Sequence, residues 1–224
     1  MSVVERLRGG LVASCQPVDN GPMDRPDIVA AMAQAAVAGG AVGLRIEGMA
    51  NLRATRRLVD VPIIGIVKRN LDDSPVRITV TVADVIALIE AGADIVAYDA
   101  TPRPRTDKRE DILAAILAHG AIAMADCATE EDARAALAAG ATVIGTTLSG
   151  YTAETASDDD GPDLALLGRF RDLGGFVMAE GRFNLPALAA EAMRAGADAV
   201  TVGSALTRME IVTGWFADAV RGAR

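Results

Sequence analysis

Four segments of the sequence share one pattern, in which an alanine-rich stretch ends at a glycine and a short β-branched run follows. They are VAGGAVGLRI (37–46), EAGADIVAYD (90–99), AAGATVIGTT (138–147) and RAGADAVTVG (194–203). Because glycine ends a helix at little cost in a left-handed conformation, the predicted joints are Gly39, Gly92, Gly140 and Gly196. These joints are 53, 48 and 56 residues apart, so each interval has room for two strand–helix units.

A second set of apolar runs supplies the remaining strands. They are GLVASCQ (10–16), VPIIGIV (61–67), AIAMADC (121–127) and GGFVMAEG (174–181). Helical stretches separate the eight runs, and Thr129 before EEDAR is a predicted N-cap. The pattern predicts a (β/α)8 TIM barrel, an α/β fold in which residues 1–224 form a single domain. A doubly wound open sheet is the alternative.

Composition restricts the kinds of function. The chain is 51% hydrophobic, and its formal net charge of −8, with an acidic segment at 157–163, disfavours binding to nucleic acid. No leader-like segment or membrane-spanning stretch is visible, so we expect no membrane association and a cytoplasmic location.

Cys15 and Cys127 form no paired motif and are predicted to be buried thiols. With His119 as the single histidine, no metal site is predicted, and His119 is expected at a helix C-terminus.

Chemistry in a barrel of this kind lies at the carboxyl ends of the strands. Cations, carboxylates and small hydroxyls all occur there. They are Ser14, Cys15 and Gln16; Arg45; Lys68 and Arg69; Asp99 and Thr101; Asp126; Thr146 and Thr147; Glu180 and Arg182; and Gly203, Ser204 and Arg208.

The last two strand ends predict a phosphate site. The loops after strands seven and eight often bind phosphate through backbone N–H groups. Gly181 and Gly203 would let the backbone approach an anion closely, Ser204 offers a hydroxyl donor, and Arg182 and Arg208 add charge. The alternative is that the glycines only end strands and the arginines only cover the surface.

Seven segments at the strand ends resemble one enzyme family. They are LVASCQP, PIIGIVKRN, AGADIVAYDAT, MADCATEEDA, GATVIGTTLSGYT, AEGRFNLP and VGSALTR. Together they are similar to the N-acylglucosamine-6-phosphate 2-epimerases, also called N-acetylmannosamine-6-phosphate 2-epimerases, from about residue 10 to the C-terminus. The chain departs from that family's usual pattern at Asn70 and Leu71, in the loop PVDNGPMD, in RIEG and in RITVTVADV.

The resemblance implies an isomerase of sialic-acid and amino-sugar catabolism that interconverts N-acetylmannosamine 6-phosphate and N-acetylglucosamine 6-phosphate without a cofactor. It implies a phosphorylated N-acyl hexosamine as substrate, and it favours a homodimer. Lys68 and Glu180 match the family's catalytic residues. The residues predicted to bind the substrate are Gln16, Arg45, Asp126, Thr146 and Arg208.

The implied chemistry is consistent with these residue types. The C2 proton of an open-chain hexosamine lies α to the C1 aldehyde, so its removal and return to the other face need a base and a proton source. Lys68 can serve as the base only if burial and nearby cations, here Arg45 and Arg69, lower its pKa from about 10.4. Glu180 can take protons on the other face or activate a substrate hydroxyl that then relays one; the alternative is a structural ion pair with Arg182 or Arg45. Asp126 either holds a substrate hydroxyl or is a structural ion-pair partner of Arg182 or Arg45.

Rival functions remain open at this point. One is another phosphate-binding barrel enzyme, such as an indole- or thiamine-pathway synthase. The other is a non-catalytic sugar-phosphate sensor, which could dispense with Lys68 or Glu180. At the C-terminus, Trp215 and Phe216 are expected to dock the last helix onto the barrel, with a dimer contact as the alternative.

Overall fold

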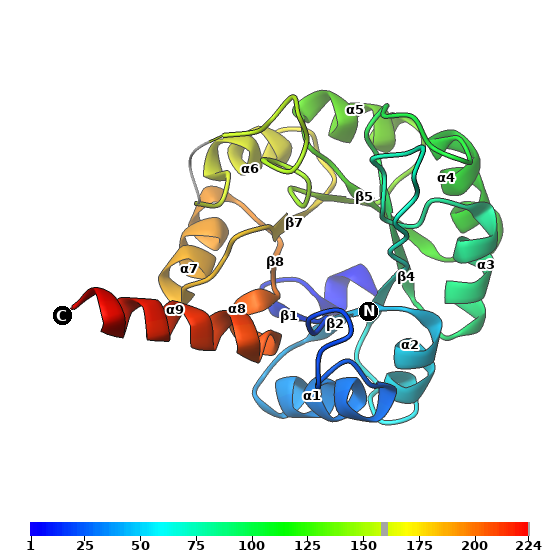
Figure 1. Ribbon diagram of the computed structural model, residues 1–224. Helices are drawn as coiled ribbons and strands as arrows, with labels where there is room; N and C mark the ends of the chain where they lie inside the picture. Colours follow the sequence, from blue (N-terminus) through cyan, green and yellow to red (C-terminus); the bar gives the residue numbers. More distant parts are fainter. Residues whose placement is uncertain (158–160, 224) are drawn as a thin grey trace.

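A computed structural model describes residues 1–157 and 161–223. Its eight parallel strands close into a barrel in chain order, because β1 pairs with β2 on one side and with β8 on the other (Figure 1). The strands are β1 (Leu11–Cys15), β2 (Gly43–Glu47), β3 (Ile63–Ile66), β4 (Ile95–Asp99), β5 (Ile122–Asp126), β6 (Val143–Gly145), β7 (Phe176–Glu180) and β8 (Ala199–Val202). The predicted (β/α)8 barrel is confirmed, and the open sheet is excluded.

Helices follow the strands and surround the barrel (Figure 1). They are the short 3-10 helix η1 (Val4–Arg6) and the α-helices α1 (Pro26–Ala38), α2 (Met49–Arg56), α3 (Val82–Glu90), α4 (Arg109–Ala118), α5 (Glu130–Ala138), α6 (Leu164–Arg171), α7 (Pro186–Ala195), α8 (Ser204–Thr207) and α9 (Met209–Gly222). Helices α1 to α7 pack buried aliphatic side chains against the outer face of the sheet.

Left-handed glycines connect helices to strands at the four repeats. Gly92, Gly140 and Gly196 have φ angles of 104°, 107° and 107°. In the first repeat the left-handed residue is Gly40, with φ 105°, while Gly39 keeps a right-handed φ of −78° as the C-cap of α1. The predicted joint was therefore wrong by one residue, because two adjacent glycines satisfy the same sequence pattern.

Alternation along the strands separates an apolar lower layer of the barrel interior from a polar upper layer. Side chains at every second position point inward. The lower interior is apolar and includes Val12, Ile64, Ile95, Met124, Val143, Met178 and Ala199. The inward positions at the carboxyl ends carry Ser14, Arg45, Asp99, Asp126, Glu180 and Thr201. The same periodicity that fills the core thus gathers polar groups at one end.

Local predictions from sequence are confirmed where they concern caps and thiols. The Thr129 hydroxyl oxygen accepts a hydrogen bond from the Asp132 N–H, and the Asp132 carboxylate accepts one from the Thr129 N–H. The two bonds complete a capping box. His119 is the C-cap of α4, and its Nδ1 lies 2.8 Å from the Ala115 carbonyl oxygen. Cys15 and Cys127 are buried free thiols.

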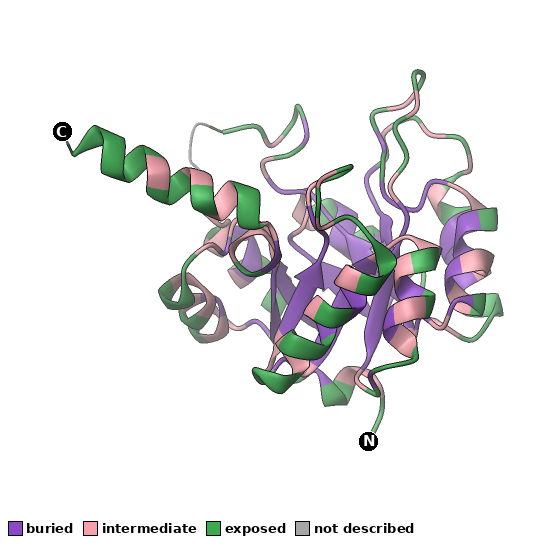
Figure 2. Ribbon diagram, turned by 60° about the horizontal axis from the view of Figure 1, so that its bottom comes forward, coloured by how far each residue is buried: buried purple, intermediate pink, exposed green. Residues whose placement is uncertain are grey.

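The last helix departs from expectation. Helix α9 extends away from the barrel, and none of its residues is buried (Figure 2). Trp215 is 41% exposed and Phe216 is 70% exposed, so these two aromatic side chains do not dock the helix onto the barrel as predicted. Only the tertiary structure could reveal this, because an amphipathic helix has the same pattern whether or not its apolar face is covered within the chain.

The structure also bears on membrane association and on the acidic segment. In the parts of the chain that are described, no helix is long and apolar enough to cross a bilayer. The acidic segment 157–163 lies partly outside the described residues. Asp163 is described, and its carboxylate caps α6 by accepting a hydrogen bond from the Leu166 N–H.

Removal of the α5 cap is expected to destabilise the barrel. Thr129→Ala deletes one half of the capping box and should lower the free energy of unfolding by about 1 kcal/mol. Urea denaturation measures this, with Thr106→Ala, an exposed loop threonine, as the matched control. Equal midpoints for the two variants would contradict the assigned role of the cap.

Candidate active site

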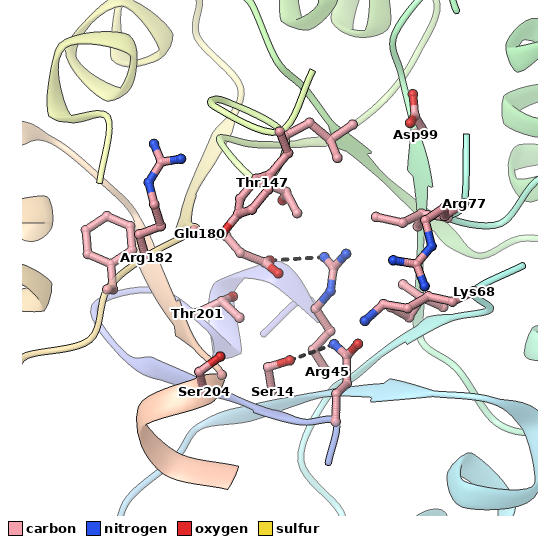
Figure 3. Close-up of a pocket in the computed structure, with 18 of the residues that line it drawn as sticks. Ser14, Arg45, Lys68, Arg77, Asp99, Thr147, Glu180, Arg182, Thr201 and Ser204 are labelled. Atoms are coloured by element: carbon pink, nitrogen blue, oxygen red, sulfur yellow. Dashed lines mark hydrogen bonds and ion pairs between the residues drawn. The ribbon is translucent and has the colours of Figure 1, made fainter. Parts of the chain in front are cut away.

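A cavity of about 450 Å³ opens at the carboxyl ends of the strands. Nine of the residues to which the sequence assigned catalysis, substrate binding or phosphate binding line it: Gln16, Arg45, Lys68, Glu180, Gly181, Arg182, Gly203, Ser204 and Arg208. Lys68 and Glu180 enter the cavity from opposite sides, with Arg45 between them (Figure 3). Residues that are far apart in sequence therefore meet at one site.

The guanidinium of Arg45 is the centre of the cavity floor. Arg45 is 1% exposed and donates to both carboxylate oxygens of Asp126, at 2.6 and 3.1 Å. Its Nη1 also donates to Oε2 of Glu180 at 3.0 Å. The paired carboxylates hold the pKa of Arg45 above its ordinary value despite burial, so this residue stays charged.

Glu180 is prepared to hold or release a proton near neutral pH. Burial raises its pKa to about 7, and the charge of Asp126 adds to the rise, while Arg45 and Lys68 oppose it. The main chain of Glu180 is fixed by Thr146, whose hydroxyl donates to the Glu180 carbonyl at 2.8 Å and accepts from its N–H at 3.0 Å. One guanidinium shared by two carboxylates leaves Glu180 incompletely neutralised.

Lys68 follows the last residue of β3 by two positions. Its main chain is held from two directions: its N–H donates to Oε1 of Glu47 at 3.2 Å, and an antiparallel bridge joins it to Ile78. Burial lowers the pKa of Lys68 to about 8, with Arg208 and then Arg45 adding to the effect, while Asp19 and Glu47 oppose it. The amine is consequently neutral in roughly a tenth of molecules at pH 7, far more than an ordinary lysine would be.

The predicted role of Arg69 in lowering the pKa of Lys68 is wrong. The Arg69 guanidinium turns outward to the carboxylate of Asp84, with Nη2 at 2.5 Å and Nε at 2.9 Å from its oxygens. The second cation that acts on Lys68 is Arg208 instead. Adjacent residues at a strand end point in opposite directions, which explains why proximity in sequence misled.

Residues at the N- and C-terminal ends of the chain close one wall of the cavity. Arg208, at the start of α9, donates through Nε to the carbonyl of Gln16 at 2.9 Å. The side-chain amide nitrogen of Gln16 donates to the Ser14 hydroxyl at 2.7 Å, while its side-chain oxygen, Oε1, is buried without a hydrogen-bond partner among the residues that the structure describes. An unpartnered acceptor in a cavity wall is suited to a hydroxyl or amide donor of a ligand.

The predicted phosphate loops lie side by side at the cavity. Gly181 has φ 106°, and a Cβ there would lie 3.7 Å from the carbonyl oxygens of Thr146 and Thr147, so glycine is required mainly by its backbone angle. Gly203 and Ser204 lie beside Ser14. Arg182 also has a left-handed φ, of 60°, and its Nε donates to the Gly161 carbonyl at 2.6 Å while its guanidinium lies over the Tyr151 ring. Its side chain therefore braces the loop after β6.

Two residues assigned to substrate binding lie behind the cavity wall. Asp126 is fully buried and is occupied by Arg45 and by the Thr147 hydroxyl, at 2.8 Å. Thr146 is 3% exposed, and its hydroxyl is used by the Glu180 main chain. Neither lines the cavity, so the geometry gives both of them positioning roles and favours the ion-pair alternative for Asp126.

Other residues that line the cavity were not selected from sequence. Thr201 lies beside Glu180 in the sheet register, and its buried hydroxyl faces the Glu180 carboxyl, whose pKa it helps to lower. The sequence could have indicated Thr201, because it is the polar residue at an inward position of an otherwise apolar strand. Arg77, on the loop after β3, also points toward the cavity, and no strand-end rule could have found it (Figure 3).

This arrangement is suited to moving a proton across a small polar substrate. An amine and a carboxyl group of similar proton affinity face one space from opposite sides, and fixed cations surround them. Such a pair can remove a proton from one face of a carbon atom and supply one to the other face. Among the described residues, no cluster of three or more His, Cys, Asp or Glu side chains could hold a metal ion.

Comparisons with known proteins agree on one family. The family model described as "Putative N-acetylmannosamine-6-phosphate epimerase" matches residues 29–222. Proteins described as "Putative N-acetylmannosamine-6-phosphate 2-epimerase" from Shigella dysenteriae and Escherichia coli O157:H7 are each 59% identical over 215 residues, which is 96% of this chain and 93% of theirs.

One solved structure is similar in fold and sequence, and another is similar in fold alone. The N-acetylmannosamine-6-phosphate 2-epimerase from Clostridium perfringens superposes with a TM-score of 0.94 at 35% identity, covering 98% of this chain and 96% of that one. A thiamine phosphate pyrophosphorylase from Pyrococcus furiosus, at 18% identity and a TM-score of 0.61, shares the fold alone. By the family model and by the identity of its relatives over nearly the whole length, the chain belongs to the N-acetylmannosamine-6-phosphate epimerase family.

Proposed function

We propose that this chain is a sugar-phosphate 2-epimerase that interconverts N-acetylmannosamine 6-phosphate and N-acetylglucosamine 6-phosphate in amino-sugar catabolism. One observation carries the proposal: Lys68 and Glu180 face each other across the cavity with pKa values of about 8 and about 7. Membership of the epimerase family supports the choice of substrate. A non-catalytic sensor would not need this pair.

The proposed reaction needs one proton to leave C2 and another to arrive on the opposite face. In the open-chain sugar, the neutral Lys68 amine takes the C2 proton, and the electron pair moves into the C1 carbonyl to give an enolate. Protonated Glu180 then donates to C2 from the other side, so the pair ends as an ammonium and a carboxylate. The reverse reaction starts from that state, and proton transfers to solvent reset the pair.

Fixed charges support the intermediate. The enolate places negative charge on O1, and Arg45 and Arg208 supply positive charge at the cavity without reorganisation. Asp126 keeps the Arg45 guanidinium in place through two hydrogen bonds. We therefore assign Arg45 the role of electrostatic stabilisation and Asp126 the role of holding it.

We assign the 6-phosphate to the loops after β7 and β8. The backbone N–H groups around Gly181, Gly203 and Ser204 lie at one side of the cavity, on the strands where barrels of this type bind phosphate. Because the Arg182 side chain is engaged with Gly161 and Tyr151, it contributes to this site through its main chain and its charge.

We further propose that the protein is a homodimer formed through α9 and that it acts in the cytoplasm. The exposed side chains of Trp215, Phe216 and Val220 give α9 an apolar surface that the chain itself leaves open to solvent, and a second copy would cover it. The cytoplasmic location is supported by the two buried free thiols, Cys15 and Cys127.

Replacement of Lys68 should abolish epimerisation. Lys68→Ala removes the base and is expected to lower kcat by about 10²- to 10⁴-fold. Proton NMR of N-acetylmannosamine 6-phosphate in D2O follows both deuterium entry at C2 and the gluco product. Lys108, the other lysine of the chain, is exposed, so Lys108→Ala is the matched control and should keep wild-type turnover.

Two results would overturn these assignments. Wild-type rates in Lys68→Ala would remove Lys68 from the mechanism. Absence of both deuterium exchange and product with the wild-type protein would instead favour the non-catalytic sensor.

The pH dependence of kcat/KM, which reports the ionisation of the free enzyme, should be bell-shaped with its maximum between pH 7 and 8. The working pair carries one proton in total, on Glu180 for one direction and on Lys68 for the other. Below the window the pair gains a second proton, and above it the pair loses its last one. Coupled assays in the two directions should therefore give the same two limbs. Limbs that differ between directions would rule out this single-proton pair.

Charge on the apolar face of α9 should separate the dimer. Phe216→Asp places a carboxylate where a second copy would bury a ring, and sedimentation velocity should then report monomer. Asp218→Asn, an exposed change on the same helix, is the control and should remain dimeric. A wild-type protein that is monomeric at micromolar concentration would contradict the proposal.

A further inference from the structure

Glu47 is a second carboxylate next to Lys68, and the mechanism above does not use it. It is the last residue of β2 and lies opposite Ile66 in the register with β3. The β2–β3 ladder continues one step further, through the Gly48 N–H to the Ile66 carbonyl at 2.9 Å. Beyond that point, the side chain of Glu47 takes over as acceptor for the N–H of Lys68, at 3.2 Å.

Glu47 is itself fixed in place. Its carbonyl oxygen accepts a hydrogen bond from the side-chain amide of Asn51 in the first turn of α2, at 2.9 Å. Burial raises the pKa of the Glu47 carboxyl, and Asp19 and Asp24 add to the rise, while the contacts with Lys68 oppose it. Its carboxyl group therefore interacts both with the peptide that carries the lysine and with the charge of the amine.

The charges around the Lys68 amine come from several elements. They are Arg45 and Glu47 on β2, Asp19 on the loop after β1, Glu180 on β7 and Arg208 at the start of α9. The two arginines favour the neutral amine, and the carboxylates favour the ammonium form. Glu47 differs from the others because it also holds the Lys68 main chain.

We propose that Glu47 is a positioning residue for Lys68, anchoring its peptide group and supplying the counter-charge that opposes Arg45 and Arg208. Two functions are combined in one side chain. The hydrogen bond keeps the lysine at the cavity wall after β3 has ended. The negative charge, when Glu47 is ionised, keeps part of the amine population protonated, as the reverse reaction requires. The link to turnover rests on the proposed function, whereas the link to Lys68 does not.

The two functions separate in two variants. Glu47→Gln keeps an acceptor for the Lys68 N–H and removes the charge, whereas Glu47→Ala removes both. Asp60→Asn is the matched control, because Asp60 is an exposed carboxylate that precedes the opposite end of the same strand, β3. Circular dichroism of all three variants verifies that they are folded.

The direct experiment measures the ionisation of Lys68 without relying on turnover. Trace acetylation with acetic anhydride across a pH series, read by mass spectrometry, reports the neutral fraction of each lysine. Lys108 is the other lysine in the chain and serves as the internal reference. In Glu47→Gln, the Lys68 midpoint should fall by about half a pH unit, a roughly threefold change in the ratio of neutral to charged amine. Asp60→Asn should leave it unchanged.

Kinetics provide the second readout. The basic limb of the kcat/KM profile should shift to lower pH in Glu47→Gln by the same amount, and Glu47→Ala should in addition lower the maximal kcat by about tenfold through the displaced lysine. An unchanged Lys68 midpoint in Glu47→Gln would overturn the assignment of Glu47. A shifted midpoint with an unchanged basic limb would support Glu47 as the partner of Lys68 and would instead overturn Lys68 as the catalytic base.

Discussion

The buried guanidinium of Arg45, shared between Asp126 and Glu180, is the interaction on which the rest of the site depends. Taking three charged groups out of water is costly, and only close pairing offsets that cost. Arg45 pairs bidentately with Asp126, so Glu180 receives one hydrogen bond and an incomplete share of the positive charge. The raised pKa of Glu180 follows from that imbalance together with its burial.

The barrel makes this arrangement possible because its lower interior is dry. Aliphatic side chains from alternate strands fill the space beneath the polar layer, so Arg45 rests on a packed core and not on water. The low polarity that raises the pKa of Glu180 also lowers that of Lys68. One environment therefore brings an amine and a carboxyl group, whose ordinary pKa values differ by about six units, to similar proton affinity.

Much of the site could be predicted from sequence because a parallel barrel places every strand end at the same rim. Lys68, Glu180 and Arg45 were identified in this way, and each lines the cavity. The differences between the predicted and the observed positions have a common origin in side-chain direction. Arg69 turns to Asp84, and Asp126 and Thr146 support other residues from behind the wall. Neither residue type nor position in the chain distinguishes a side chain that enters a cavity from one that holds its neighbour.

The sequence by itself determined the eight strand–helix units, the helix-ending glycines, and the polar residues at the carboxyl ends of the strands. These depend on local conformational preference and on hydrophobic periodicity, which short segments carry on their own. Tertiary structure decided which cations act on Lys68, which carboxylates share the Arg45 guanidinium, and where α9 lies. Those outcomes depend on distances between segments that are far apart in the sequence, such as Arg45 and Asp126 or Lys68 and Arg208, and only the closed barrel sets such distances.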